Sequence, residues 1–298
     1  MYIIIKIKVI DKKYFSYQNT GRYLSLYASI IVKEVYVRSV GMANTNDHGL
    51  SRTIPEAVKR EVRQRCGFGC VICGVGFYDY EHFAPDFVDA TDHNPDGMTL
   101  LCPRCNQNRA RGRLSRETVA LANQNPVCIM NGHANEMFDF HSDPIEVVFA
   151  GVTFYDCAHL IMVNGRSLLS VRPPQEVSSP MLLSGVFCDS IGRDALVIKD
   201  NEWSVNTGNW DVECIGPRIT IRSGPGNIVL VLKLNPPRGI IVERLDMLFE
   251  GVRFRGNDQT LEICMDGIHW QRWFGCSMSN CQVGIYIETR PKAANDPC

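Results

Sequence analysis

The spacing of apolar positions divides the chain at about residue 145. C-terminal to this point, apolar and polar residues alternate in short runs that end at Gly, Asn, Asp or Pro, as in residues 146–150, 218–222, 227–232 and 283–287. Alternation with a period of two is typical of β-strands that bury one face. We therefore predict an antiparallel all-β domain over residues 145–298.

A weak repeat runs through this β region. Phe149-Ala-Gly-Val, Leu183-Ser-Gly-Val and Phe249-Glu-Gly-Val are each followed by another apolar run. Such a repeat is expected either of recurring hairpins in a sandwich or of the rungs of a short solenoid. The copies are unevenly spaced along the chain, which favours a sandwich-like domain.

Residues 53–125 follow a helical pattern at both ends. Thr53-Ile-Pro-Glu56 has the spacing of a capping box with proline in the first turn, and it predicts a helix that ends at the glycines of residues 67–69. A second helix is predicted after Ser115, ending before Pro126. Residues 126–144, which include an Asn-Gly pair, are predicted to be a linker between the two domains.

Residues 1–52 are predicted to be an N-terminal extension. Residues 1–41 mix β-branched runs with aromatic residues, and Met42 then opens a polar stretch. Two alternatives follow from this change. Either the native protein begins at Met42 and residues 1–41 are an over-long gene prediction, or residues 1–41 form a genuine N-terminal hairpin.

Composition and charge narrow the functional classes. The hydrophobic content of 45% and the charged content of 21% are those of a soluble globular protein. Lys and Arg number 31 against 32 Asp and Glu, so a surface that binds nucleic acid must be local. Because no apolar run approaches the roughly 20 residues of a membrane span, we expect no membrane partner.

The 13 cysteines are unusual for a chain of this length. Most of those outside the two pairs described next lie in strand-like apolar runs, where free cysteine is a common small core residue in a reducing compartment. The apolar segment at the N-terminus is short and interrupted by lysines, unlike a signal peptide. We therefore expect a cytoplasmic protein.

Four cysteines form two Cys-x-x-Cys pairs, Cys70-Val-Ile-Cys73 and Cys102-Pro-Arg-Cys105. Two such pairs can supply four thiolates to one tetrahedral Zn²⁺, and a site with all four positions closed is structural rather than catalytic. The sequence thus predicts a structural zinc site.

Residues of another kind lie between and after these pairs. Glu81-His82 lies between them, and Asn106 follows the second pair at once. Together with the cysteines, this order resembles the HNH endonuclease family in its four-cysteine zinc-binding form, over residues 53–125. The resemblance implies a small ββα-metal, treble-clef-like fold, in which a hairpin carries the acidic-His pair and a helix begins at the second pair. The whole chain is then expected to be α+β.

The resemblance also implies a chemistry, the metal-dependent hydrolysis of DNA phosphodiester bonds. His82 would be the general base that activates water, while Glu81 and Asn106 would bind one catalytic divalent cation, Mg²⁺ or Mn²⁺. Such a reaction needs a positioned base near neutral pKa and a hard cation, and hard cations prefer oxygen ligands.

The sequence departs from the family pattern at two positions. Asn106 stands where the family's final His is expected, and Gly97 stands where a central Asn is expected. Three neighbours of Gly97 are candidates for orienting the base in place of that Asn: His93, Asn94 and Asp96.

DNA is the expected partner, through clusters of basic residues. Phosphate binding is the natural use of such clusters. The candidates are Lys59, Arg63, Arg109, Arg111 and Arg113. The alternative function is a non-catalytic, zinc-stabilised module for DNA binding or assembly. The β domain is expected to bind a protein partner or a second copy of the chain.

Overall fold

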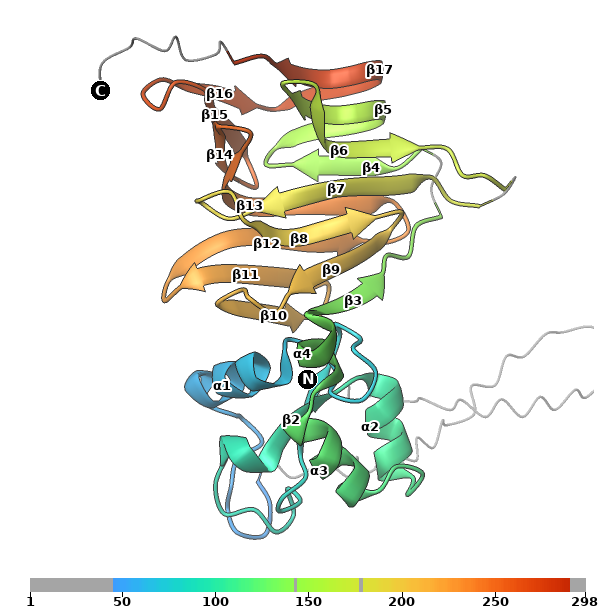
Figure 1. Ribbon diagram of the computed structural model, residues 1–298, viewed down its shortest axis with the longest axis vertical. Coiled ribbons are helices and arrows are strands. Elements are labelled where there is room, and N and C mark those ends of the chain that lie inside the picture. Colours follow the sequence, from blue (N-terminus) through green and yellow to red (C-terminus); the bar gives the residue numbers. More distant parts are fainter. Residues whose placement is uncertain (1–44, 142–143, 177–178, 290–298) are drawn as a thin grey trace, which may run out of the picture. The chain divides into compact units, whose positions relative to one another are not determined.

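A computed structural model describes residues 45–141, 144–176 and 179–289 (Figure 1). The fold is mixed α/β and mostly β-sheet, with 15% helix and 49% strand. The expectations for residues 1–41 and for a start at Met42 lie outside the described residues. No helix in the described ranges is long and apolar enough to cross a membrane.

The cysteine-containing region is built from short elements. They are α1 (Glu56–Cys66), β1 (Asp79–His82), the 3-10 helix η1 (Pro95–Gly97), β2 (Met98–Leu101), α2 (Pro103–Ala110) and α3 (Arg116–Gln124). β1 and β2 form an antiparallel two-stranded sheet in which His82 lies opposite Met98. The elements share a small core that includes Val62, Phe83, Leu100 and Val119.

The helix boundaries follow the expected signals except at one end. α1 ends at Gly67, which adopts a left-handed conformation with φ 73°, and Ser115 caps α3 by accepting a hydrogen bond from the Thr118 amide. The predicted capping box is wrong, because Pro55 occupies the N-cap of α1 and no side chain caps this helix. Glu56 is consequently the first helical residue, and it lies too close to the helix start for the reciprocal bond of a capping box.

The range predicted as a linker contains regular structure. Residues 126–144 include α4 (Val127–Asn131) and β3 (His133–Met137), and β3 pairs with β9 (Glu202–Asn206) as an edge strand of the large sheet. Phe138 and Phe140 follow β3 and are buried near Trp203. The polar residues that suggested a linker belong to a helix end and to an edge strand, where polar side chains stay exposed.

The remaining strands and β3 form one 15-stranded sheet. They are β4 (Glu146–Phe149), β5 (Val152–Val163), β6 (Arg166–Arg172), β7 (Leu182–Cys188), β8 (Asp194–Lys199), β9, β10 (Asp211–Ile215), β11 (Arg218–Gly224), β12 (Asn227–Asn235), β13 (Gly239–Phe249), β14 (Val252–Asn257), β15 (Thr260–Cys264), β16 (Trp270–Phe274) and β17 (Cys276–Ile287). Neighbours are antiparallel except for two parallel pairs, β13 with β4 and β17 with β5.

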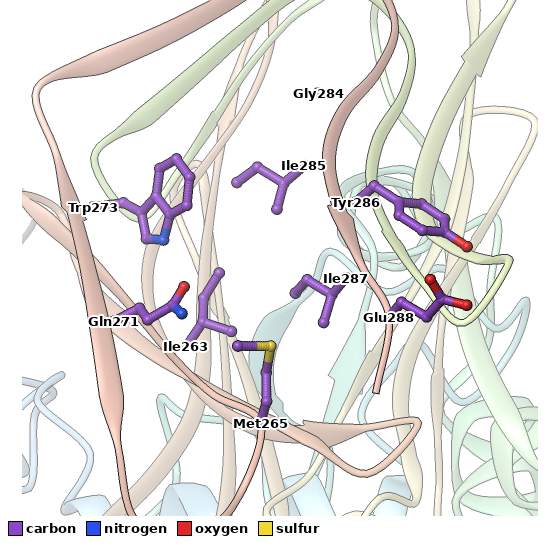
Figure 2. Close-up of a pocket in the computed structure, with 9 residues that line it drawn as sticks. All are labelled: Ile263, Met265, Gln271, Trp273, Gly284, Ile285, Tyr286, Ile287 and Glu288. Carbon is purple, nitrogen blue, oxygen red and sulfur yellow. The ribbon is translucent and has the colours of Figure 1, made fainter. Parts of the chain in front are cut away.

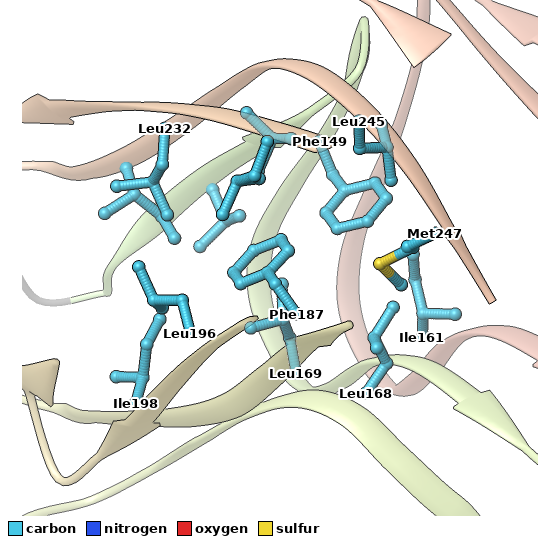
Figure 3. Close-up of a cluster of buried hydrophobic side chains, with 14 of the residues drawn as sticks. Phe149, Ile161, Leu168, Leu169, Phe187, Leu196, Ile198, Leu232, Leu245 and Met247 are labelled. Atoms are coloured by element: carbon cyan, nitrogen blue, oxygen red, sulfur yellow. The ribbon is translucent and has the colours of Figure 1, made fainter. Parts of the chain in front are cut away.

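The sheet curls, so that its two halves face each other around one core (Figure 3). Phe149 and Phe187 come from opposite walls, and their ring centroids lie 6.0 Å apart. The predicted β region is present, but its walls belong to one hydrogen-bonded sheet instead of the two sheets of a sandwich. Long strands explain the difference, since β5 pairs with β4 at its start and with β6 at its end.

Two of the three repeat copies are the same turn. Ala150-Gly151 and Glu250-Gly251 both adopt positive φ values and join β4 to β5 and β13 to β14. Two-residue turns with positive φ match the right-handed twist of hairpin strands. The third copy lies inside β7, where Gly185 allows close packing against Leu169. The repeat therefore marks hairpins in two places and a close strand contact in the third.

A buried ionic network joins α1 to the sheet. The Arg63 guanidinium donates to Asp211 of β10 at 2.8 and 2.9 Å and to Glu213 at 3.0 Å. It also donates to the hydroxyl of Tyr80 at 2.7 Å, and Arg222 of β11 pairs with both acids from the other side. The strand that carries Glu81 and His82 is thereby tied to the sheet through Tyr80.

Candidate functional site

The two cysteine pairs come together as one cluster. The sulfur atoms of Cys70, Cys73, Cys102 and Cys105 all lie within 4.8 Å of one another. The Cys73 and Cys102 sulfurs are 3.6 Å apart, and those of Cys73 and Cys105 are 3.9 Å apart. A tetrahedral zinc ion bound at about 2.3 Å would separate its sulfur ligands by about 3.8 Å. The cluster can therefore hold a metal ion such as zinc, as the spacing predicted.

Local backbone geometry positions both pairs. In the first pair, the Gly74 amide donates to the Cys70 carbonyl at 2.8 Å, and the Val71 amide donates to Leu100 of β2 at 3.1 Å. In the second pair, Cys102 is the N-cap of α2, and its sulfur accepts a hydrogen bond from the Cys105 amide at 3.4 Å. Partial desolvation raises the pKa of the Cys73 thiol, so that a metal ion binding at the cluster would release a proton from it.

His82 is linked to His93 and, through it, to the backbone. Nε2 of His82 lies 3.1 Å from Nδ1 of His93, whose Nε2 lies 2.9 Å from the Ser51 carbonyl oxygen. Because a carbonyl oxygen only accepts, Nε2 of His93 carries a proton. When both rings are neutral, Nδ1 of His93 must then accept from Nε2 of His82. This chain leaves Nδ1 of His82 with its lone pair and without a hydrogen-bond partner among the described residues.

Burial sets the charge state of His82. The residue is only 8% exposed, and burial together with the neighbouring His93 lowers its pKa to about 4. The ring of Phe87 lies 5.3 Å from the His82 ring and covers part of it. The neutral imidazole with its free lone pair has the protonation state of a general base, but a pKa of about 4 makes it a weaker base than a histidine near neutral pKa.

Glu81 lies in a different group of contacts. Its Oε1 accepts from Arg109 of α2 at 2.8 Å, and Arg109 also pairs with Asp86 and donates to the His82 carbonyl at 3.3 Å. Burial raises the pKa of Glu81 in spite of the Arg109 charge, and Asp86 and Asp79 raise it further. Arg109 thus connects the carboxylate to the backbone of the strand that carries the histidine.

The other candidates for the site are placed less favourably. Asn106 lies half-buried in α2, and its side-chain amide has no hydrogen-bond partner among the described residues. Asn94 accepts from the Asp96 amide and caps η1, while Asp96 pairs with Arg65 at 3.4 Å. Of the three candidates for orienting the base, His93 alone contacts His82.

Gly97 has a structural reason for being glycine. A Cβ atom at this position would lie 2.0 Å from the Ala84 carbonyl oxygen. The Gly97 carbonyl in turn accepts from the amides of Phe83 and Ala84, immediately after β1. The close backbone approach that stabilises the end of this strand therefore leaves no room for an asparagine side chain.

The predicted DNA contacts divide into two groups. Arg63 is 1% exposed, so the prediction that it binds DNA is corrected. Arg109 pairs with Glu81 and Asp86, and its contact with DNA stays a prediction. Lys59 is partly exposed and lies 3.8 Å from Glu56. Arg111 and Arg113 are exposed and form no ion pair among the described residues. Sequence reasoning could not separate these groups, because the acids that bind Arg63 lie about 150 residues further along the chain.

Sequence reasoning missed a segment that precedes the cysteine region. The Asn46 side-chain amide donates to the carbonyls of Phe87 and Ala90, both at 2.6 Å, and Ser51 accepts from His93 as described above. These contacts fix the loop that carries Asp86, Phe87 and His93. In the sequence this segment is only part of a polar stretch within the predicted N-terminal extension, and no motif distinguishes Asn46.

A separate hollow of about 360 Å³ lies in the sheet, between β15–β16 and β17 (Figure 2). Ile285 and Ile287 face Ile263 and Trp273 across it. Its lining is mostly apolar, and it contains none of the predicted site residues.

No protein-family model matches the chain, and neither the curated proteins nor the solved structures include a match.

Proposed function

We propose that the cysteine-containing region is an HNH-type nuclease module that hydrolyses phosphodiester bonds in DNA. The observation that carries the proposal is the state of His82, a buried and neutral imidazole whose Nδ1 is free to accept a proton. The sequence-based resemblance adds support, as does the arrangement of β1, β2 and α2, in which the helix begins at the second cysteine pair. Zinc at the four cysteines would be structural.

In the proposed reaction, Nδ1 of His82 takes a proton from the attacking water. His93 keeps the opposite nitrogen of the ring protonated, because its own Nδ1 accepts from that nitrogen. The base therefore has one available lone pair and a fixed ring orientation. General-base catalysis of this kind contributes about 10²- to 10⁴-fold to a rate.

Glu81 and Asn106 are the proposed ligands of a catalytic Mg²⁺ or Mn²⁺ ion, which would neutralise charge that develops on the phosphate. Both side chains offer oxygen, the donor that these ions prefer. Oε1 of Glu81 accepts from Arg109, which leaves its second oxygen for a cation, and the side-chain amide of Asn106 makes no hydrogen bond among the described residues. The raised pKa of Glu81 indicates a carboxylate that a further positive charge would stabilise.

Exposed arginines around α2 are the proposed DNA contacts. Arg111 and Arg113 lie in the turn after α2, and the exposed Arg104 and Arg116 lie at the starts of α2 and α3. Phosphate contacts of this kind give sequence-independent affinity that decreases with salt. Selectivity for a DNA site, a protein partner or self-association would then fall to the β region.

The alternative is a non-catalytic, zinc-stabilised module that binds DNA or assembles with a partner. The Glu81–Arg109 ion pair favours it, because a carboxylate already paired with arginine has less need of a cation. The two functions share the zinc cluster and the exposed arginines. They differ in whether His82 acts as a general base.

Plasmid cleavage by zinc-loaded protein, with and without Mg²⁺ or Mn²⁺, separates the two functions. We expect cleavage only with added metal, and a loss of at least about 100-fold in His82→Ala. His141→Ala is the matched control, since His141 is exposed and lies outside the site. Metal-dependent cleavage that survives His82→Ala would refute the assigned base. DNA binding without cleavage under either metal would favour the non-catalytic module.

A further inference from the structure

Two thiols in the sheet lie unusually close together. The sulfur atoms of Cys157 in β5 and Cys281 in β17 are 2.9 Å apart. In the four-cysteine cluster, the sulfur atoms of Cys73 and Cys102 are 3.6 Å apart. A shared tetrahedral zinc ion would hold two sulfurs about 3.8 Å apart, whereas a disulfide bond is about 2.05 Å long. The spacing of Cys157 and Cys281 is thus too short for a shared zinc ion and approaches that of a bond.

The backbone brings these two thiols together by a feature that both strands share. β5 and β17 run parallel and side by side (Figure 1), and Cys281 lies directly opposite Cys157 in the register. Asp156 and Asn280, the residues just before them, both have φ 53°. Because the same left-handed residue occurs at the same level in each strand, the strands stay in register and both cysteines turn to the same side.

The two cysteines differ in access to solvent. Cys157 is 4% exposed, and its sulfur lies 3.4 Å from the Met278 carbonyl oxygen. Cys281 is only half-buried. An oxidant from solvent therefore reaches Cys281 first, and Cys157 is the thiol placed to react with the product.

We propose that Cys157 and Cys281 form a dithiol site that a peroxide converts into a disulfide between β5 and β17. The Cys281 sulfur attacks one peroxide oxygen, the O–O bond breaks, and a sulfenic acid and water result. The Cys157 sulfur then displaces the hydroxyl of this sulfenic acid, which leaves as a second water with the Cys157 thiol proton. Two thiols lose two electrons in total, and the peroxide gains them.

The bond would fasten the last described strand of the sheet. Among the described residues β17 pairs with β5 alone. Residues of β17 also line the hollow of Figure 2, including Ile285 and Ile287. The thiol or disulfide state of this pair therefore determines how firmly one wall of that hollow is attached.

Peptide mapping of the full-length, zinc-loaded protein tests the proposal. The protein is treated with hydrogen peroxide, denatured, alkylated with N-ethylmaleimide and digested. We expect a linked pair of peptides that contains Cys157 and Cys281, and a melting temperature higher by roughly 5 °C or more. Cys188→Ser removes another buried thiol of the sheet and should leave both results unchanged.

The proposal is overturned if both cysteines are recovered alkylated after treatment, or if Cys281 is linked to a different cysteine such as Cys276. Cys281→Ser should abolish the link and the rise in melting temperature. Should this variant fail to fold, the peptide map of the unsubstituted protein still decides the question. Neither measurement depends on nuclease activity, so the result is independent of the proposed function.

Discussion

The cysteine-containing region and the curled sheet are stabilised in different ways. The core of the first is small and includes three of the four cluster cysteines, whereas the sheet encloses a core of aromatic and aliphatic side chains from both of its walls. Small cores supply little stability and commonly depend on a metal or on disulfides. The region that holds the proposed nuclease site is therefore also the region whose stability we expect to depend most on a bound ion.

The two regions also differ in their polar interior. The cysteine-containing region buries His82 and Arg63, and the sheet contributes Asp211 and Glu213 as the partners of Arg63. Elsewhere the sheet buries mainly apolar side chains, apart from Asp189 and Asn201. Most of the buried charged side chains thus lie at the proposed site or in the ionic network that joins α1 to the sheet. In both places the orientation of the side chains matters more than burial alone.

The largest expected effect comes from breaking the zinc cluster. Cys105→Ser should abolish stoichiometric zinc binding and unfold residues 53–125, because binding energy on the order of 10 kcal/mol is coupled to folding in small zinc sites. The sheet should stay folded, since its core does not use the cluster. Hydrogen exchange combined with zinc analysis checks both expectations.

Cys66→Ser is the matched control for this substitution. Cys66 is fully buried in the same small core but lies outside the cluster. This variant should keep its zinc and lose only modest stability. A Cys105→Ser protein with protected amides throughout α1 and α2 would contradict the dependence on metal.

The next largest effect is expected from breaking the buried ionic network that joins α1 to the sheet. Arg63→Met should destabilise the protein by about 3–5 kcal/mol, because Asp211 and Glu213 stay buried after losing the Arg63 guanidinium. Urea unfolding measures this change. Arg218→Ala, which breaks an exposed pair with Glu243, should change the free energy of unfolding much less, because exposed ion pairs contribute little. Equal losses in the two variants would show that the buried network does not join the regions.

Some of this architecture follows from local sequence and some does not. The cysteine spacing predicted the cluster, and alternation predicted the strands, because both depend on residues close together along the chain. The burial of Arg63 depends on acids in β10 that are remote in sequence. Likewise, Asn94 and Asp96 looked equivalent to His93 until the loop conformation directed only His93 at His82. Long-range contacts and loop geometry are what the pattern alone could not provide.

The smallest expected effect is a pH dependence of the free energy of unfolding, and it comes from a histidine of the cysteine-containing region. His82 is the one histidine among the described residues that is buried, and its pKa in the folded protein is about 4. An unfolded chain has a histidine pKa of about 6.5, so as the pH falls the unfolded state binds the proton first. The contribution of His82 to stability is therefore complete above about pH 6.5 and is lost between about pH 6.5 and 4.

The loss is at most about 3 kcal/mol, from 1.36 kcal/mol per pKa unit. His82→Gln keeps a side chain of similar size that does not titrate, so its free energy of unfolding should fall less between pH 7 and pH 4.5. Comparing the two proteins in their zinc-loaded states cancels the proton uptake by the cysteines, which is common to both. Parallel stability curves would mean that His82 is not held neutral by burial. The base of the proposed reaction would then have to be sought outside the buried interior of the cysteine-containing region.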